Sequence, residues 1–325
     1  MEGLFAVLFL VLAAEFVNGW TDAPNAIATV VSTKVLSPPR AVLLATSLNI
    51  VGALCGTAVA ATIGKNIVVL SAINLETLAA ALLGIIIWSS ANAKWGIPTS
   101  ESHALVAGLA GATLATAGPE ALLWIGWKKV VIGLVFSSVV GFMVSMLIAW
   151  FIIARFSTCA PTRTNVWFSR LQIVSAGFMA FNHGSNDGQK FIGVFAMALV
   201  LGGVYSTFTV PLWVILLCAG TIGIGTMVGG RRIIKKVGMS MVDLKPWQGF
   251  CAETAAGGTI MVASHFGIPL STTHTIIMAI AGVGASRRLD GVRWDIAKDI
   301  VLAWVLTFPV CGAIGFIVAL LIKQF

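Results

Sequence analysis

The chain alternates long apolar runs with short polar stretches. Four runs are each long enough for a membrane-crossing helix, which needs about 20 apolar residues: residues 41–63, 128–154, 208–229 and 297–322. These runs are continuous, whereas the strands of a membrane β-barrel alternate apolar and polar positions. The pattern therefore predicts an all-α polytopic membrane protein.

Two longer apolar segments are interrupted near their middle by polar residues. Residues 3–36 are interrupted from Asn18 to Asn25, and residues 171–204 from Asn182 to Lys190. At about 1.5 Å per residue, such a segment exceeds a hydrocarbon core of about 30 Å. We therefore expect each segment to form a tilted or broken helix.

Two octets, Gly96–His103 and Gly267–His274, interrupt the remaining apolar sequence. Each contains Gly-Ile-Pro followed by hydroxyl side chains, and a proline ends one helix but fits the first turn of the next. The octets thus predict the tips of two helical hairpins, with arms over residues 76–92 and 99–117 and over residues 247–264 and 270–286. Each second arm would direct unpaired N–H groups and the positive end of its dipole at the tip, which favours an anion.

These features recur in the same order and define an internal repeat. At an offset of 165 residues, Phe16, Gly19 and Asp22 match Phe181, Gly184 and Asp187. At an offset of 171, Gly96, Ile97, Pro98, Ser100 and His103 match Gly267, Ile268, Pro269, Ser271 and His274. We divide the chain into an N-terminal transmembrane repeat (1–156), a cytoplasmic connecting loop (157–170) and a C-terminal transmembrane repeat (171–325). If each hairpin re-enters without crossing, each half has three spans, and the two repeats have inverted topology.

Composition and charge agree with a membrane protein and suggest its orientation. The chain is 58% hydrophobic and 10% charged, with a mean hydropathy of +0.99. Most of its 20 Lys and Arg residues fall near residues 34–40, 155–170, 231–245 and 287–298. By the positive-inside rule these segments are cytoplasmic, which places both termini outside a plasma or inner membrane. The net charge of +8 then reflects basic loops rather than a nucleic-acid partner.

Asp22 and Asp187 are carboxylates at matching positions within apolar segments. A charge at the bilayer centre costs about 2.5–3.5 kcal/mol even on lenient scales, so each carboxylate needs a partner. Few basic residues lie at that depth, which makes a bound cation the better candidate. Neutral oxygens from Asn25, Thr21 and Asn186 would suit Na⁺, with the ion centred on Asp22, Asn25 and Asp187. The alternative is that both Asp residues only cap half-helices.

Hydroxyl groups at the hairpin tips are the candidates for anion binding. They are Ser100, Ser102, Ser271, Thr272 and Thr273. Their alternative role is to cap the second arms of the hairpins. Lys190, just after the second Asp motif, could meet the anion or pair with Asp187.

Further ionisable residues inside the apolar segments are candidates for ion coupling. They are Glu15, Glu101, Glu253, His103 and His274. Buried hydrogen-bonded packing is the alternative for the glutamates, and a structural role is equally open for the histidines. The five cysteines are scattered without metal-binding spacing, so no cofactor is expected besides the coupling ion.

At these residues the chain resembles the PiT family of inorganic phosphate transporters. That family carries a Gly-x-Asn-Asp-type motif near the start of each half and a Gly-Ile-Pro-x-Ser-Thr-Thr-His-type tip later in each. Gly184–Asp187 and Gly267–His274 match these motifs, whereas the first copies depart at Thr21, Pro24 and Glu101-Ser102. The resemblance covers essentially the whole chain and implies cation-coupled phosphate uptake by a homodimer.

The sequence as a whole predicts a symporter that imports inorganic phosphate with Na⁺ across a lipid bilayer, and not an enzyme. Proton coupling through the glutamates and sulfate as the substrate are the alternatives within the transporter class. An anion channel is the alternative of a different class, although paired broken segments with buried carboxylates favour coupled transport.

Overall fold

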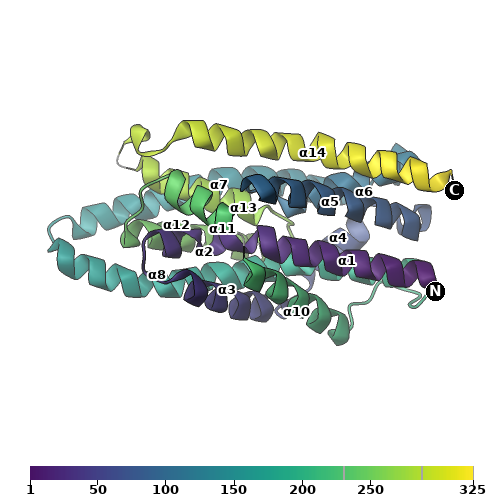
Figure 1. The fold of residues 1–325 in the computed structure, drawn as a ribbon, viewed down its shortest axis with the longest axis horizontal. Helices are drawn as coiled ribbons and strands as arrows, with labels where there is room; N and C mark the ends of the chain where they lie inside the picture. The colour runs from purple at the N-terminus through teal and green to yellow at the C-terminus, as the bar shows by residue number, and fades with distance from the viewer. Residues whose placement is uncertain (230, 287, 325) are drawn as a thin grey trace.

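The computed structural model describes residues 1–229, 231–286 and 288–324, and within these ranges the protein is an elongated helical bundle (Figure 1). Most helices run along the long axis, which fits the predicted all-α membrane architecture. Within the described ranges, four helical segments are long and apolar enough to cross a membrane, or up to six if each bent pair counts as one span. These four segments are residues 2–32, 75–95, 124–156 and 294–323.

The first half of the chain contains the predicted series of elements. Its helices are α1 (Glu2–Thr21), α2 (Ala23–Ser32), α3 (Pro38–Ala53), α4 (Ala58–Asn66), α5 (Leu75–Trp95), α6 (Glu101–Thr116) and α7 (Trp124–Phe156), with short 3₁₀ turns at Leu70–Ala72 and Pro119–Ala121. The predicted hairpin arms over residues 76–92 and 99–117 correspond to α5 and α6, and the predicted span over residues 128–154 corresponds to α7.

The second half repeats this series in the same order. Its elements are α8 (Pro161–His183), a π-helical turn (Gly184–Gly188), α9 (Gln189–Leu201), α10 (Leu212–Val228), α11 (Arg231–Ile234), a second π-helical turn (Lys235–Ser240), α12 (Pro246–His265), α13 (Thr272–Ala285), a 3₁₀ turn (Leu289–Gly291) and α14 (Trp294–Lys323). The predicted hairpin arms over residues 247–264 and 270–286 correspond to α12 and α13.

The two interrupted segments differ in how their helices change. In the first, α1 ends at Thr21 and α2 begins at Ala23, so the break is the single residue Asp22, with Pro24 in the first turn of α2. In the second, the chain passes from α8 to α9 through a π-helical turn and does not part. Of the two expected forms, a tilted or a broken helix, the second segment therefore keeps a continuous helix with a local irregularity. Because no proline lies within residues 182–190, the helix can widen by one residue instead of ending.

Glycine ends the first arm of each hairpin. Gly96 and Gly267 have φ values of +66° and +62°, a left-handed conformation that favours glycine. The N–H groups of Gly96 and Ile97 donate back to carbonyls in the last turn of α5, and Gly267 and Ile268 do the same for α12. The prolines lie in the connections, and the second arms begin only at Glu101 and Thr272.

A bend divides the span predicted over residues 41–63. Helices α3 and α4 meet at an angle of 65° around residues 54–57, where Gly56 has a φ of +99°. Helix α4 then packs against α9 of the other half. The bend was not expected, because it depends on the surface that α9 provides and the apolar pattern continues across it.

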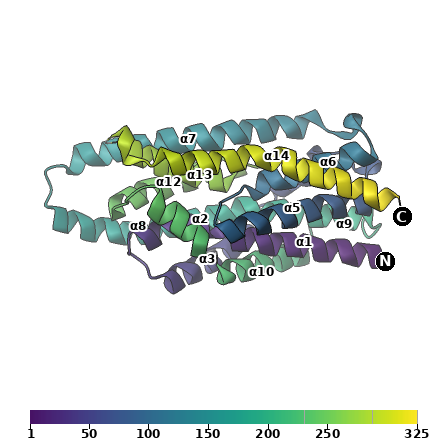
Figure 2. The same ribbon diagram turned by 45° about the horizontal axis from the view of Figure 1, so that its top comes forward.

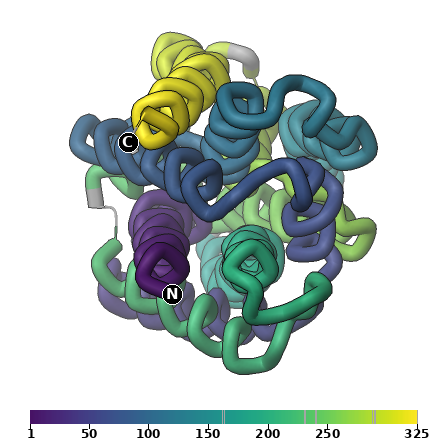
Figure 3. Tube along the Cα trace, turned by 90° about the vertical axis from the view of Figure 1, so that its right-hand side faces the viewer, coloured from purple at the N-terminus to yellow at the C-terminus, as the bar shows by residue number. Residues whose placement is uncertain are grey.

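The two hairpins start at opposite ends of the bundle. Both chain termini lie at one end (Figures 1 and 3), and the open end of the α5–α6 hairpin lies beside them, next to Lys323. The open end of the α12–α13 hairpin lies at the other end, where Trp150 donates to the carbonyl of Ser286 at 2.8 Å, close to the α7–α8 connection (Figure 2). This placement is the one expected if the two halves are inverted, and the inversion itself stays a prediction.

Three of the basic residues used to predict the orientation lie wholly or partly outside the described part of the chain. Arg287 lies outside the described residues, and the side chains of Arg163 and Arg231 are not described. Among the others, Lys65 is exposed and lies over the ring of Phe208.

Candidate functional site

The two hairpin tips meet in the middle of the bundle. The hydroxyl of Ser102, in the first turn of α6, donates to the carbonyl oxygen of Leu270 in the other tip at 2.7 Å. At the next position in α6, the ring of His103 lies 4.6 Å from that of His274 in an edge-to-face arrangement. The N-termini of α6 and α13 therefore converge on one region, where their dipoles favour negative charge.

Two of the five predicted anion-binding hydroxyls cap these helices. Ser100 accepts from the N–H of His103 at 3.3 Å, and Ser271 accepts from the N–H of His274 at 3.1 Å. Each side chain thereby satisfies one of the N–H groups that lack an intrahelical partner in a first turn. The remaining three hydroxyls, of Ser102, Thr272 and Thr273, contact Lys190, Asp187 and Asp22 respectively. These six buried side chains, together with Asn25, form the polar cluster of the site.

Asp22 lies among neutral hydrogen-bond donors. Its Oδ1 accepts from the hydroxyl of Thr273 and from Nδ2 of Asn25 at 3.3 Å. Asn25 also donates to the Thr273 hydroxyl at 2.9 Å, and its own Oδ1 is buried without a partner. Helix α2 thus supplies an amide oxygen next to the carboxylate at the end of α1, and both residues contact the tip of the opposite hairpin.

Asp187 lies among charged and polar partners. Its Oδ1 accepts from the ammonium group of Lys190, and its Oδ2 accepts from the hydroxyl of Thr272 at 2.8 Å. Nε2 of His183 lies 3.4 Å from the same Oδ2, and Nδ1 of His183 lies 3.0 Å from Asn49. Lys190 also donates to Ser102 and, at 2.8 Å, to the carbonyl oxygen of Leu270.

The two carboxylates lie together. One ligand atom each from Asp22, His183 and Asp187 can be chosen so that all three lie within 4.8 Å of one another. Two carboxylates at this distance face one ammonium group, so the cluster favours a further positive charge. Oxygen ligands suit a hard cation such as Na⁺.

Thr21 and Asn186, which also occupy matching repeat positions, point toward the hairpins instead. Thr21 donates to Oε1 of Glu101 at 2.8 Å, and Ser89 donates to the other oxygen of that carboxylate at 2.8 Å. Asn186 donates to Ser264 at 2.8 Å, while its Oδ1 is buried without a partner. Glu101 therefore links α1, α5 and α6 through two hydroxyl groups.

The other two candidate glutamates have separate hydrogen-bond partners. Glu15 accepts from Asn18 at 3.0 Å, and its Oε1 has no partner. Glu253 accepts from Thr29 at 2.5 Å, from Gln172 at 3.2 Å and from Ser175. The carboxylate of Glu253 thus joins α2, α8 and α12.

The two candidate histidines pack mainly against aromatic rings. His274 stacks on Trp304 of α14 with ring centroids 3.6 Å apart, and His103 lies 4.9 Å from Phe308 of the same helix. Both nitrogens of His274 are buried without a hydrogen-bond partner. These contacts show that the two histidines also join the hairpin tips to α14.

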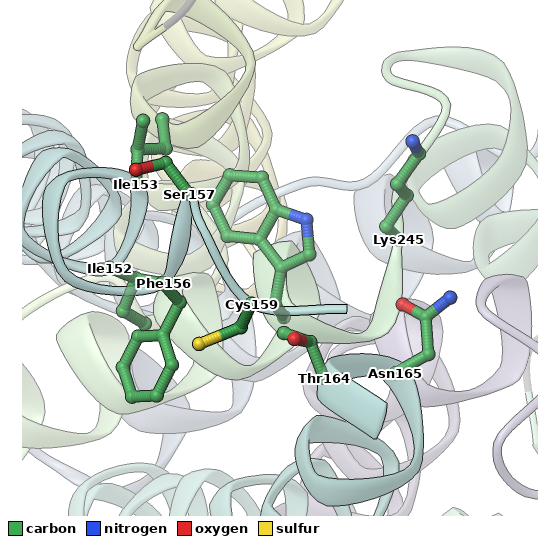
Figure 4. A pocket seen from close by; sticks show the side chains of 9 residues that line it. Ile152, Ile153, Phe156, Ser157, Cys159, Thr164, Asn165 and Lys245 are labelled. Atoms are coloured by element: carbon green, nitrogen blue, oxygen red, sulfur yellow. The ribbon is translucent and has the colours of Figure 1, made fainter. Parts of the chain in front are cut away.

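The cluster is closed to solvent in this conformation. Asp22 is 2% exposed, Lys190 1% and Ser102 3%. A surface cavity of about 290 Å³ lies elsewhere, between the end of α7 and the start of α8, where Phe156, Cys159 and Lys245 line it (Figure 4). A ligand can therefore reach the tips only if helices or hairpins move.

Sequence reasoning missed the polar residues that support the site. His183 contacts Asp187, and Ser89, Thr29 and Ser175 bind the buried glutamates. His183 had a signal, because it lies within the second polar interruption at the repeat position of Asn18. The single hydroxyl residues had none, because isolated Ser and Thr are common in apolar helices.

Comparison with known proteins connects this geometry to a family. Residues 18–315 match the model of the phosphate transporter family. The chain is 42% identical over 317 residues to a probable low-affinity inorganic phosphate transporter of Rhizobium meliloti (strain 1021), covering 97% of this chain and 94% of that protein. It is 39% identical over 314 residues to a protein of the same description from Bacillus subtilis (strain 168), covering 95% and 94%.

A solved structure has the same fold. It is described as the sodium-dependent phosphate transporter and superposes with a TM-score of 0.92 at 24% sequence identity, covering 100% of both chains. The similarity extends over all the helices that build the polar cluster.

Proposed function

The chain belongs to the phosphate transporter family and is an inorganic phosphate transporter, and we propose that it imports phosphate together with sodium ions. The observation that carries this proposal is the position of Thr273. Its hydroxyl belongs to a hairpin tip that is a candidate for phosphate binding, and it bonds to both Asp22 and Asn25, the candidate ligands of Na⁺.

A shared element of this kind couples the two ligands. Na⁺ at Asp22 would hold Thr273, and with it the first turn of α13, in position for the anion. The cation would also offset the charge of phosphate in a buried site. Each ligand then favours binding of the other, and the coupling is reciprocal. The name of the solved structure with the same fold also supports sodium as the coupling ion.

The hydrogen-bond inventory of the cluster favours phosphate over sulfate. Near neutral pH phosphate retains at least one proton, whereas sulfate has none. The tips offer donors to both anions, but the carboxylate of Asp187 can accept a further hydrogen bond beside those from Lys190 and Thr272, and only a protonated anion can supply it. Sulfate would face this carboxylate without a hydrogen bond, which lowers its affinity.

We also propose that the halves are inverted repeats in the cell membrane, with both termini outside and a homodimer as the assembly. The opposite entry of the two hairpins supports the inversion, and the distribution of basic residues supports the orientation. The dimer rests on the family resemblance alone.

The test is uptake of radiolabelled phosphate into proteoliposomes that hold the purified protein. An inward Na⁺ gradient is compared with an inward H⁺ gradient, and sulfate is added as a competitor. We expect uptake that Na⁺ drives and that sulfate does not inhibit.

Each other outcome points to a different mechanism. Uptake driven by H⁺ alone would contradict sodium coupling and move that role to Glu15, Glu101 or Glu253. Inhibition by sulfate would contradict the acceptor argument. Electrogenic anion flux that needs no cation gradient would indicate a channel.

A further inference from the structure

Lys190 marks the main difference in charge between the two halves of the cluster. At the offset of 165 residues that matches Asp22 with Asp187, Asn25 matches Lys190, and at the hairpin offset of 171, Ser102 matches Thr273. The contacts follow the same correspondence. Asn25 donates to Thr273 and Asp22, and Lys190 donates to Ser102 and Asp187. One arrangement therefore occurs twice, with an amide in one copy and an ammonium group in the other.

The surroundings of the Lys190 ammonium group resemble those of a bound cation. A lysine has three donors, and here they meet the carboxylate of Asp187, the hydroxyl of Ser102 and the carbonyl oxygen of Leu270. Carboxylate, hydroxyl and carbonyl oxygens are also the ligands that hard cations take from proteins. The side chain is 1% exposed, and a charge this deeply buried is stable only when it is paired.

Among the described residues, no positively charged side chain donates to Asp22. Its hydrogen-bond donors, Thr273 and Asn25, are both neutral. The amide oxygen of Asn25 is buried and has no partner, so it is available to a mobile ion. Each copy therefore offers a carboxylate, a hydroxyl and a carbonyl-type oxygen, from the backbone of Leu270 in one and from the amide of Asn25 in the other, but only the Lys190 copy already contains a positive charge.

We infer that Lys190 is a tethered cation that fills the second of two pseudo-equivalent cation sites, so that only the Asp22 site exchanges ions during transport. The inference rests on the proposed cation coupling and concerns the number of ions rather than their identity. It implies that a transporter of this design moves one coupling ion fewer per phosphate than one with an amide at both positions. The fixed charge would also stay beside the hairpin tips throughout the cycle.

The test is the ratio of radiolabelled sodium to radiolabelled phosphate taken up by proteoliposomes. The Lys190→Asn variant places beside Asp187 the same amide side chain that Asn25 places beside Asp22. We expect it to carry one more sodium ion per phosphate than the unmodified protein and to depend more steeply on sodium concentration. Lys190→Met is the matched control, because it removes the charge without offering an oxygen. Its uptake should be lost and should not return at high sodium concentration.

The mirror substitution, Asn25→Lys, tests the same idea from the other copy. It should lower the ratio by one sodium ion, and it keeps the inference testable if Lys190→Asn does not fold. An unchanged ratio in an active, folded Lys190→Asn or Asn25→Lys variant would overturn the inference. Weaker phosphate affinity at an unchanged ratio would mean that Lys190 binds the anion directly.

A failure of the tethered-cation inference can be distinguished from a failure of the proposed sodium coupling. If protons drive uptake in the unmodified protein, sodium coupling is wrong. The tethered-cation inference is then tested by the electrical charge moved per phosphate. Lys190→Asn should still raise this charge by one positive elementary charge.

Discussion

Asp22 and Asp187 have matching positions in the two halves but different electrostatic surroundings. Lys190 and His183 accompany Asp187, whereas only neutral groups donate to Asp22. Removal of the charge at Asp22 would therefore affect the proposed cation site. Removal of the charge at Asp187 would instead leave a buried ammonium group unpaired, a change that is strongly destabilising.

The Asp22→Asn variant is expected to weaken binding of both sodium and phosphate. The substitution keeps the shape of the side chain but removes the charge that attracts the cation, and the coupled anion loses affinity with it. We expect each half-saturation concentration to rise about tenfold or more, which corresponds to about 1.4 kcal/mol. Transport kinetics in proteoliposomes measure both values. Asp295→Asn, at an exposed position, is the control, and normal sodium dependence in Asp22→Asn would contradict the proposed site.

Glu253 is expected to act in packing rather than in coupling. It accepts hydrogen bonds from Thr29, Gln172 and Ser175, so it already has three partners from two other helices. Glu253→Ala would leave these donors unpaired and lower the free energy of unfolding by about 3 kcal/mol. Thermal unfolding in detergent measures the loss, and the remaining uptake should keep its sodium dependence. Unchanged stability with lost cation dependence would instead identify Glu253 as a coupling group.

Glycines permit the closest contacts between helices. A Cβ atom at Gly19 of α1 would lie 2.3 Å from the carbonyl oxygen of Ile222 in α10. In the other half, a Cβ atom at Gly184 would lie 2.1 Å from the carbonyl oxygen of Asn49 in α3. The same crossing thus occurs twice, each time between an interrupted segment of one half and a helix of the other, next to the two Asp residues. Small residues at such crossings let backbones approach within a membrane, where lipid provides no hydrophobic driving force.

The Gly19→Ala variant is expected to destabilise the fold. An added methyl group would push α1 away from α10, and overpacking of this kind costs about 1–3 kcal/mol. Gly220→Ala, in α10, is the matched control, because a Cβ atom there meets nothing within 4 Å. Fluorescence-detected size-exclusion chromatography after heating compares the two variants. Equal melting temperatures would show that the crossing tolerates the shift.

Each hairpin tip is held by an element from the other half. Thr62 of α4 donates to the carbonyl oxygen of Gly267 at 2.7 Å, and Arg232 of α11 donates to that of Lys94. Helix α6 packs against α14, and α13 packs against α7. Movement of one half therefore changes the support of the hairpin that belongs to the other half, which suits a transporter that must open its site.

The arrangement of the whole molecule places both termini at one end and the α7–α8 connection at the other (Figure 1). With the termini outside, this connection faces the cytoplasm. It contains Cys159, which is exposed, so the chain carries a natural probe of its orientation.

Cys159 is expected to react with a membrane-impermeant maleimide only after cells are permeabilised. The experiment uses a Cys55→Ser background, because Cys55 is the other exposed cysteine among the described residues. Gln324→Cys, near the C-terminus, should be labelled in intact cells. Labelling of Cys159 in intact cells would reverse the proposed orientation.

The sequence alone determined the features that depend on neighbouring residues. Apolar runs of sufficient length defined α5, α7, α12 and α14, and the Gly-Ile-Pro octets defined the hairpin tips. The repeat offsets already paired Asp22 with Asp187, and the motifs were enough to identify the family. Such features can be read locally because helix periodicity and chain breakers act within a few turns.

Only the tertiary structure decided which side chains meet. Asp22 bonds to Thr273, 251 positions away, and Lys190 bonds to Ser102, 88 positions away. No local pattern specifies these pairs, because they arise where two hairpins and two interrupted helices pack together. The bend between α3 and α4 has the same origin, because it depends on the surface that α9 of the other half supplies, and this surface exists only in the folded protein.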